Sequence, residues 1–266
     1  MSSNDSIKKN IVQPSSLEIA SRDIYPSITN ETTFGNRSSS PAGHPKVHFV
    51  PSTLKSTLGS PTALAIGAFS TTLTTLSLSL MEWRGVTTTN VYIGNFFFVA
   101  GIGMVISAQW ELVLGNSFGY TALSAFGFFY GGFGAIITPL FGVTESYGTD
   151  TVEYNNALGF FVLMWAVLNL FFFLGSLPIN LVYIGIFGFV EVCFTLVAAS
   201  YFAAADGHIE AARALKVSGG VFGFLAGLLG WYTMGHLMCQ TTFFWHFPMG
   251  DTSRFFIRAG KDENSR

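Results

Sequence analysis

Long apolar stretches separated by short polar ones fill the chain from about residue 60 to residue 240. A helix needs about 20 mostly apolar residues to cross the hydrocarbon core of a membrane. The pattern predicts six such spans, at about 61–81, 91–110, 120–140, 157–177, 179–202 and 217–239. Pro178 separates the fourth and fifth spans. Because proline lacks an N–H and constrains the residue before it, we predict two helices joined by a tight turn there.

The composition points to the same class of protein. Half of the residues are hydrophobic and only 11% are charged, against about 25% in a soluble domain. A net charge of −2 with 13 Lys and Arg residues leaves no basic field for nucleic acid. We therefore predict an all-α membrane protein, a six-transmembrane-helix bundle, whose surroundings are membrane lipid and not nucleic acid.

The two ends of the chain differ from its middle. Residues 1–59 are rich in Asn, Ser, Thr and Pro and hold no apolar run of spanning length, so we predict a mostly disordered polar N-terminal tail. Residues 60–240 form the predicted transmembrane domain, and residues 241–266 form a C-terminal tail. No basic segment followed by an apolar one opens the chain, so no cleaved signal peptide is expected.

Basic residues set the expected orientation, because Lys and Arg concentrate on the cytoplasmic side. With six spans both tails share one side, where six basic residues of the N-tail and four of the C-tail make ten. The other side has three, which are Arg84, Arg213 and Lys216. Both termini are therefore predicted to be cytoplasmic, in the plasma membrane. No Lys or Arg lies between Arg84 and Arg213, so an anion in the middle spans must use hydroxyls, amides or backbone N–H groups, or travel as the neutral acid.

The third span opens with the most specific string of the chain. Residues 115–127 read Gly-Asn-Ser-Phe-Gly-Tyr-Thr-Ala-Leu-Ser-Ala-Phe-Gly. The string resembles the Gly-Asn-Thr-Phe-Gly-x-Thr-Ala-x-x-Ser-Tyr-Gly signature of the acetate uptake transporter family, the Gpr/Fun/YaaH group of bacteria and fungi. The resemblance covers about residues 59–236, and the long polar N-tail is similar to that of fungal members. It implies a six-helix protomer with its own pathway, assembled as a homo-hexamer, that moves acetate and other small monocarboxylates together with protons and without a cofactor.

The start of the first span departs from the family pattern. Residues 60–66 read Ser-Pro-Thr-Ala-Leu-Ala-Ile where the family has Asn-Pro-Ala-Pro-Leu-Gly-Leu, a motif associated with transport. The matching residues Ser60, Pro61 and Leu64 are candidates for binding substrate. Two alternatives stay open, the first because the motif is altered and the second because of the resemblance to fungal members. One is a sensor or regulator of acetate or ammonium adaptation, and the other is an exporter of ammonium or ammonia.

The resemblance also implies an apolar constriction. Its aromatic, aromatic and aliphatic members match Phe69, Phe126 and Val190, with Phe126 in place of the usual tyrosine. Gly230 matches a small residue that affects the size of acid that passes. Counted from the predicted span starts, the two rings lie roughly 9–12 Å from the cytoplasmic mouth and Val190 roughly 17 Å.

Hydroxyl and amide groups supply further candidates for substrate binding. Thr71, Thr72 and Thr75 in the first span, with Asn116 and Thr121 at the start of the third, have the groups needed to hydrogen-bond a carboxylate. The alternative for the hydroxyls is a hydrogen bond to the backbone carbonyl four residues earlier, or to a neighbouring helix.

Two glutamates are candidates for proton coupling. Glu191 lies in the middle of the fifth span, where a charged carboxylate costs roughly 2.5–3.5 kcal/mol. It is either a proton site coupled to transport or a permanently protonated group that hydrogen-bonds across a helix contact. Glu111 ends the second span, where it is either a solvated charge at a helix end or part of a substrate vestibule.

Glycines four residues apart allow helices to approach closely, within or between protomers. This spacing links Gly219, Gly223 and Gly227, and also Gly127 and Gly131. The sequence shows no catalytic constellation of nucleophile, base and acid, no metal-ligand spacing and no phosphate-binding loop. We therefore predict that the protein is not an enzyme and holds no metal.

Overall fold

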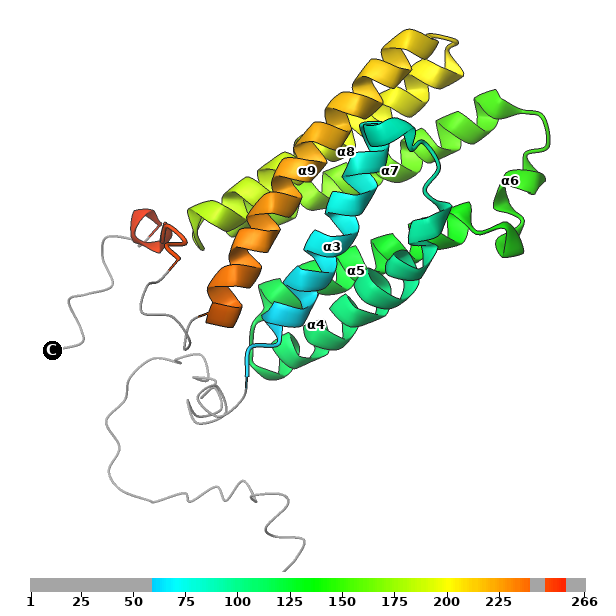
Figure 1. The fold of residues 1–266 in the computed structure, drawn as a ribbon. Coiled ribbons are helices and arrows are strands. Elements are labelled where there is room, and N and C mark those ends of the chain that lie inside the picture. The colour runs from blue at the N-terminus through cyan, green and yellow to red at the C-terminus, as the bar shows by residue number, and fades with distance from the viewer. Residues whose placement is uncertain (1–58, 240–246, 257–266) are drawn as a thin grey trace, which may run out of the picture. The chain divides into compact units, whose positions relative to one another are not determined.

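The computed structural model describes residues 59–239 and 247–256. Within these ranges, six helical segments are long and apolar enough to cross a membrane, which confirms the predicted all-α six-helix class. The predicted N-terminal tail and most of the C-terminal tail lie outside the described residues. The spanning segments are α3 (Thr62–Leu80), η3 (Asn95–Ile102) continued by α4 (Gly103–Val113), α5 (Ser117–Ile137), α7 (Thr151–Ser176), α8 (Leu181–Ala205) and α9 (Ile209–Cys239) (Figure 1).

Short elements connect these helices. Three 3-10 turns, η1 (Trp83–Gly85), η2 (Asn90–Tyr92) and η4 (Pro139–Phe141), and the four-residue helix α6 (Val143–Ser146) lie in the connections, and η5 (Ser253–Phe255) lies near the C-terminus. The segment η3 is π-helical and passes directly into α4. Pro178 lies in the gap between α7 and α8.

Three helices begin earlier than the hydropathy pattern predicts: α5 by three residues, at Ser117, and α7 and α9 by six and eight. Helix α7 starts at Thr151, where the Asp150 side chain caps it by accepting a hydrogen bond from the Glu153 N–H (2.9 Å). Helix α9 starts at Ile209 and includes a charged, alanine-rich first part of strong helix formers. A hydropathy pattern detects only the part of a helix that is apolar enough to lie in hydrocarbon. The polar first turns of these helices were therefore not predicted.

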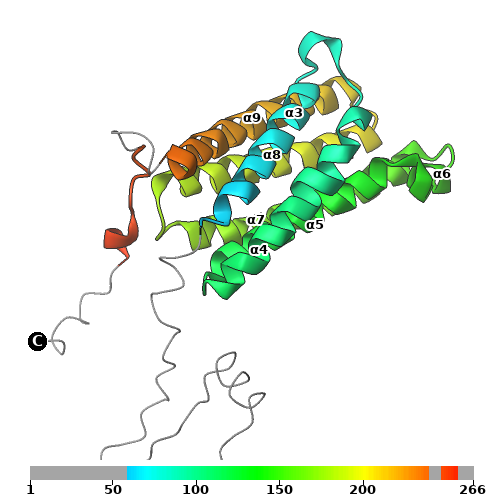
Figure 2. The ribbon, with the colours of Figure 1, turned by 60° about the horizontal axis from the view of Figure 1, so that its bottom comes forward.

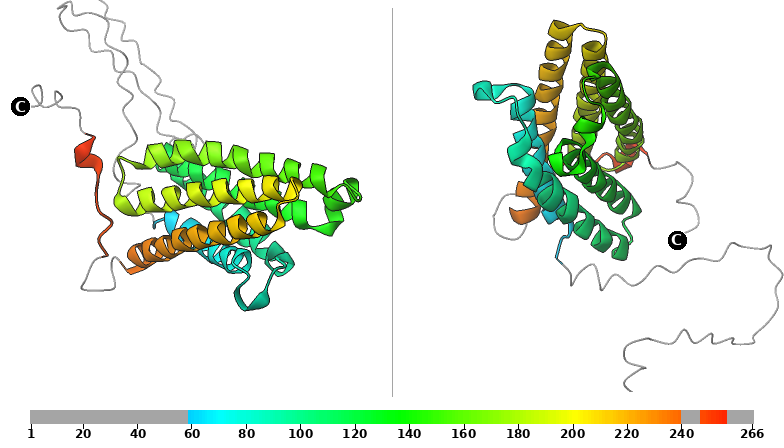
Figure 3. Two further views of the ribbon diagram at one scale, coloured as in Figure 1. Left: turned by 90° about the horizontal axis from the view of Figure 1, so that it is seen from above. Right: turned by 90° about the vertical axis from the view of Figure 1, so that its right-hand side faces the viewer.

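The six segments form a closed ring. Helix α3 packs between α4 and α9, and α8 packs between α7 and α9 (Figures 2 and 3). Helix α5 pairs with α4 and closes the ring against α7 and α8 through aromatic rings. These include the pairs Phe118–Phe172 and Phe129–Phe194, whose centroids lie 6.4 and 5.0 Å apart.

Glycines let α9 approach α3 and α8 within the protomer. A Cβ atom on Gly227 would lie 2.4 Å from the Thr74 Cγ2, and one on Gly219 would lie 2.9 Å from the Val197 Cγ2. A Cβ atom on Gly223 would lie 2.6 Å from the Ser77 hydroxyl oxygen. On α5, a Cβ atom on Gly127 would lie 2.8 Å from the Val105 Cγ2 of α4. By contrast, nothing described lies within 4 Å of a Cβ placed on Gly131, so that glycine faces away from the bundle.

We call the end of the bundle where α3 begins and α9 ends the tail end, and the opposite end the far end. At the tail end, residues 247–256 fasten the α7–α8 turn to α9. The Leu181 N–H donates to the Gly250 carbonyl (2.8 Å), and the Thr252 hydroxyl donates to the Leu177 carbonyl (2.6 Å). The Tyr232 hydroxyl of α9 donates to the Pro248 carbonyl (2.8 Å). This segment therefore holds the turn beside the entrance described next.

Candidate transport pathway

Two cavities lie one after the other inside the ring of helices. The wide cavity, of about 300 Å³, occupies the tail-end half, and the narrow cavity, of about 50 Å³, lies towards the far end. Phe69 of α3 and Phe126 of α5 line both cavities. These two rings therefore form the partition between the cavities, which we call the collar.

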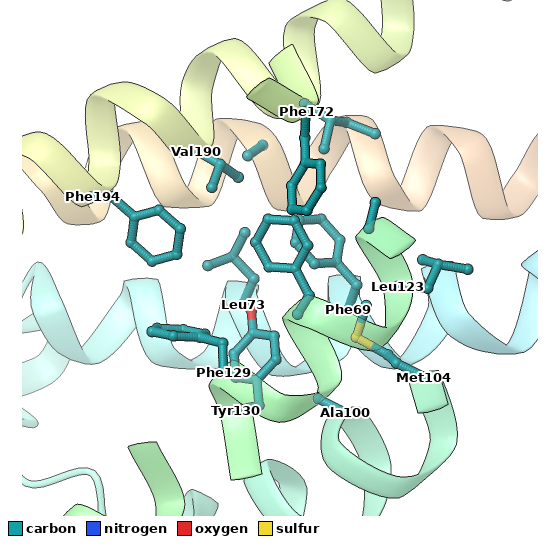
Figure 4. Packing of buried hydrophobic residues seen from close by; sticks show 14 of the residues in the cluster. Phe69, Leu73, Ala100, Met104, Leu123, Phe129, Tyr130, Phe172, Val190 and Phe194 are labelled. Atoms are coloured by element: carbon teal, nitrogen blue, oxygen red, sulfur yellow. The ribbon is translucent and has the colours of Figure 1, made fainter. Parts of the chain in front are cut away.

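The collar is closely packed and apolar. The centroids of Phe69 and Phe126 lie 6.0 Å apart, with the rings edge to face, and both residues are buried. Val190 of α8 is buried as well and lines the narrow cavity together with both rings. Figure 4 shows Val190 and Phe194 approaching this interior space opposite Leu73 of α3. The structure thus brings the three residues of the expected constriction to one cavity.

The observed helix starts change the expected depths. Phe69 comes seven residues after Thr62, while Phe126 and Val190 each come nine residues after Ser117 and Leu181, the first residues of their helices. At 1.5 Å per residue, the depths are about 10 Å for Phe69 and about 14 Å for the other two. Val190 is therefore shallower than the roughly 17 Å predicted, because α8 begins two residues later than the pattern indicated.

Further aromatic rings hold Phe126 in place. Phe172 of α7 and Phe187 and Phe194 of α8 lie with their centroids 6.0, 6.2 and 6.3 Å from that of Phe126. Such aromatic contacts stabilise the packing beyond what burial of the rings' apolar area contributes. The collar is therefore supported from α3, α5, α7 and α8 together.

The threonines of α3 that were expected to bind substrate lie away from both cavities. The Thr71 hydroxyl donates to the Gly67 carbonyl (2.8 Å) and the Thr75 hydroxyl to the Thr71 carbonyl (2.9 Å). Thr72 is fully buried, and its hydroxyl has no partner among the described residues. The physical reason is helical register: the face of α3 towards the pathway carries Thr62, Ile66, Phe69, Leu73, Leu76 and Leu80.

Most residues of the altered motif at the start of α3 also lie outside the lining of the two cavities. Ser60 and Pro61 line a shallow pocket with Trp110, and Leu64 is 56% exposed. Within the same segment, Thr62 and Ile66 do line the wide cavity. Sequence reasoning missed Thr62. The repeat of Ile66, Phe69 and Leu73 on one helical face was the signal that would have found it.

Glu111 is buried at the mouth of the wide cavity, and is not the solvated helix-end charge that we considered. The Thr62 hydroxyl donates to its Oε1, and the Asn116 Nδ2 donates to its Oε2 at 2.7 Å. Asn116 also caps α5, because its Oδ1 accepts the Gly119 N–H (3.0 Å). Thr62, Asn116 and Gly119 all line the wide cavity. Thr121 is apart from them, since it is exposed and donates to the Ser117 carbonyl (2.8 Å).

Glu191 lies at the contact between α7 and α8, outside the lining of either cavity. The buried amide of Asn169 donates to Glu191 Oε2 (2.8 Å) and to the Phe187 carbonyl (3.0 Å). The Asn169 Oδ1 has no partner among the described residues. Glu191 therefore connects to the wide cavity only indirectly, through Asn169 and the backbone of Phe187.

Gly230 of α9 lies against Ser70 and Phe69 of α3. A Cβ atom on it would lie 2.3 Å from the Ser70 Oγ and 3.3 Å from the Phe69 Cδ1. A larger residue there would have to displace α3 or the Phe69 ring. In the described ranges, no three His, Cys, Asp or Glu side chains come together as a metal site.

A family model described as the GPR1/FUN34/yaaH family matches residues 43–250. The chain belongs to this family. The acetate transporter protein patA of Penicillium expansum is 54% identical over 201 residues, 76% of this chain and 81% of that protein. The ammonia transport outward protein 2 of Saccharomyces cerevisiae is 33% identical over 172 residues, 65% of this chain and 58% of that protein.

A solved structure has the same fold. The structure of the bacterial acetate channel SatP matches with a TM-score of 0.62 at 25% identity, over 73% of this chain and 99% of that one. These relatives are transporters and channels, and the present member of the family is a multi-pass membrane protein and not an enzyme.

Proposed function

We propose that this protein is a membrane transporter or channel for small monocarboxylates such as acetate, and that the acid crosses together with a proton. The observation that carries the proposal is the pair of cavities in line through the bundle, separated by the Phe69–Phe126 collar. The relatives named for acetate transport support the substrate class.

The lining of the pathway favours a neutral species. No charged side chain lines either cavity, as far as the described residues show. An unpaired carboxylate in such surroundings is costly, whereas the undissociated acid is not. An apolar collar of this kind hinders hydrated ions. Movement as the undissociated acid carries one proton with each acetate.

Glu111 and Glu191 remain the candidates for proton coupling, and they differ in position. Glu111 touches residues that line the wide cavity, whereas Glu191 reaches it only through Asn169 and Phe187. If Glu191 is a coupling site, Glu191→Gln flattens the pH dependence of uptake in a folded protein. An unchanged pH profile assigns Glu191 a structural role.

We also propose a homo-hexamer in the plasma membrane with both termini in the cytoplasm. The outward-facing Gly131 and Gly132, beside exposed apolar residues such as Phe128, line a shallow apolar groove that another copy could fill. Epitope tags at Met1 and Arg266 should both become accessible only after permeabilisation. A tag that is stained on intact cells contradicts this orientation.

Flux into proteoliposomes tests the function. Purified full-length protein should give labelled-acetate uptake that exceeds uptake into protein-free liposomes and saturates with acetate. Uptake equal to that of protein-free liposomes at every acetate concentration contradicts the proposal.

Ammonia is the second candidate substrate. The similarity to the ammonia transport outward protein 2 favours it, and a small neutral molecule fits an uncharged pathway. Labelled methylammonium in the same proteoliposomes separates the two candidates. Protein-dependent flux of methylammonium without flux of acetate favours the second.

A further inference from the structure

The wide cavity has one polar end within an otherwise apolar lining. Thr62 comes from the first turn of α3, and Asn116 and Gly119 come from the start of α5. Behind them lies Glu111, which is only 4% exposed. Asn116 itself is exposed, so this polar end lies where the cavity meets its surroundings.

Most of the hydrogen-bond donors at this end are already used by the protein. The single hydrogen of the Thr62 hydroxyl goes to Glu111 Oε1, and one amide hydrogen of Asn116 goes to Glu111 Oε2. The Gly119 N–H goes to Asn116 Oδ1. A ligand therefore meets the remaining amide hydrogen of Asn116, the lone pairs of the Thr62 hydroxyl and the second lone pair of Asn116 Oδ1. Tyr183 also lines the wide cavity, and its hydroxyl can donate or accept.

This set, with acceptors that need a donor from the ligand, fits a carboxylic acid better than a carboxylate. The acid donates its O–H to the Thr62 oxygen, and its carbonyl accepts from the Asn116 amide. A carboxylate has acceptors only, so it leaves the Thr62 lone pairs without a donor.

Charge acts in the same direction. The start of α5 favours a negative charge, and the Glu111 carboxylate already supplies one. A second carboxylate at the Thr62–Asn116 end meets a like charge, and no cation among the lining residues offsets it. The titratable group facing Glu111 from α8 is Tyr183, which interacts with it electrostatically and is neutral near pH 7.

We infer that Thr62 and Asn116 form the carboxyl-binding subsite of the wide cavity, and that Glu111 is the positioning residue that sets this subsite to accept the undissociated acid. The inference rests on the proposed transport of monocarboxylates and specifies which form of the acid is bound.

An imposed membrane potential distinguishes electroneutral movement of acetate with a proton from movement of the anion alone. Labelled-acetate uptake is measured as an initial rate in proteoliposomes carrying the full chain, with a potassium gradient and valinomycin setting the potential. The rate in protein-free liposomes is subtracted, because the neutral acid also crosses bare bilayer. An anion's equilibrium ratio changes about tenfold for every ~60 mV, whereas the neutral acid does not respond.

The wild-type protein should give a protein-dependent rate that follows the concentration of undissociated acid and is insensitive to the potential. Glu111→Gln, which removes the charge but keeps the shape, should add a component that depends on the potential and raise the KM for acetate several-fold. Thr62→Val should raise the KM without adding that component. Glu145→Gln, an exposed carboxylate elsewhere, serves as the matched control and should match the wild type in both respects.

Two outcomes overturn the inference. One is wild-type flux that responds to the potential as an anion's does, and the other is a folded Glu111→Gln protein that equals the wild type in both KM and potential response. Absence of any protein-dependent flux in the wild type is a different result, because it overturns the proposed function and this inference with it.

Discussion

The wide cavity holds about 300 Å³ and ends in a hydrogen-bonded polar cluster, whereas the narrow cavity holds about 50 Å³ and has an almost wholly apolar lining. They meet at the same two rings, Phe69 and Phe126. The comparison assigns different tasks to the two halves of the pathway. The tail-end half offers room and groups that recognise a carboxyl, and the far half limits size and polarity.

The two halves of the pathway differ because the faces of α3 and α5 that line it carry different residues at the two ends. On α3 that face carries Thr62 at the tail end and Leu73, Leu76 and Leu80 beyond the collar. On α5 it carries Asn116 at the tail end and Phe129 and Phe133 beyond the collar. Substitutions at the collar should therefore change the difference between the two halves most, and substitutions remote from it should change that difference least.

The largest effect is expected from Phe126→Ala, which joins the two cavities. Removing the ring leaves a hole in the contacts with Phe172, Phe187 and Phe194, at a cost of about 3–5 kcal/mol in stability. The flux of longer acids such as hexanoate should rise several-fold relative to acetate. Phe128→Ala, two residues away and 64% exposed, is the control and should keep the wild-type size preference. If a folded Phe126→Ala protein keeps the wild-type size preference, the collar does not select acids by size.

A smaller effect is expected from Gly230→Ala, whose methyl group would push against α3 and the Phe69 ring and so narrow the pathway. The new methyl group meets Ser70 at 2.3 Å and Phe69 at 3.3 Å, and such overpacking costs about 1–3 kcal/mol. Thermal unfolding should occur at a lower temperature, and flux of acids larger than acetate should fall first. Gly131→Ala, with nothing described within 4 Å, is the matched change and should leave the unfolding temperature of the protomer unchanged or raised. Equal losses in both variants contradict the assignment of Gly230 to the collar.

A further test compares one hydroxyl from each cavity. Tyr130 lines the narrow cavity, and no hydrogen bond joins its hydroxyl to another described residue. Tyr130→Phe should therefore leave the KM for acetate unchanged, while Thr62→Val raises it. Both changes should alter stability by about 1 kcal/mol or less. An increase in KM that is larger for Tyr130→Phe reverses the proposed division of tasks.

The smallest effect is expected at the far end, outside the pathway. The Arg213 guanidinium donates to Glu82 Oε2 (2.6 and 3.0 Å), and this hydrogen bond lowers the pKa of the Glu82 carboxyl. A lowered pKa stabilises the fold above the ordinary pKa of the carboxyl, and the contribution is lost as pH falls through the lowered value. Arg213→Gln should therefore lower the unfolding temperature slightly near neutral pH and not at all in strong acid. Because the pair is exposed, the effect should be small and salt-sensitive.

The sequence predicts the architecture well because spanning helices depend on length and hydropathy, which are local properties. The family resemblance, anchored by the string at 115–127, also pointed to Phe69, Phe126 and Val190, which line one cavity in the structure. The contact between Thr62 and Glu111 escaped prediction, because the residues are 49 apart and the family motif matched at 60–66 has alanine where Thr62 stands. The direction of the α3 hydroxyls escaped it too, because hydropathy cannot distinguish a face that lines a pathway from one that packs on another helix.

The most direct test of the account asks whether substrate passes between Phe69 and Phe126. Labelled-acetate flux is compared in proteoliposomes carrying wild type, Phe126→Trp and Phe128→Trp, with folding of each checked by thermal unfolding. We expect Phe126→Trp, which overfills the collar, to lose most of the protein-dependent flux, and Phe128→Trp, on the exposed face of the same helix, to retain it. Wild-type flux in a folded Phe126→Trp protein would place the pathway elsewhere and contradict the account.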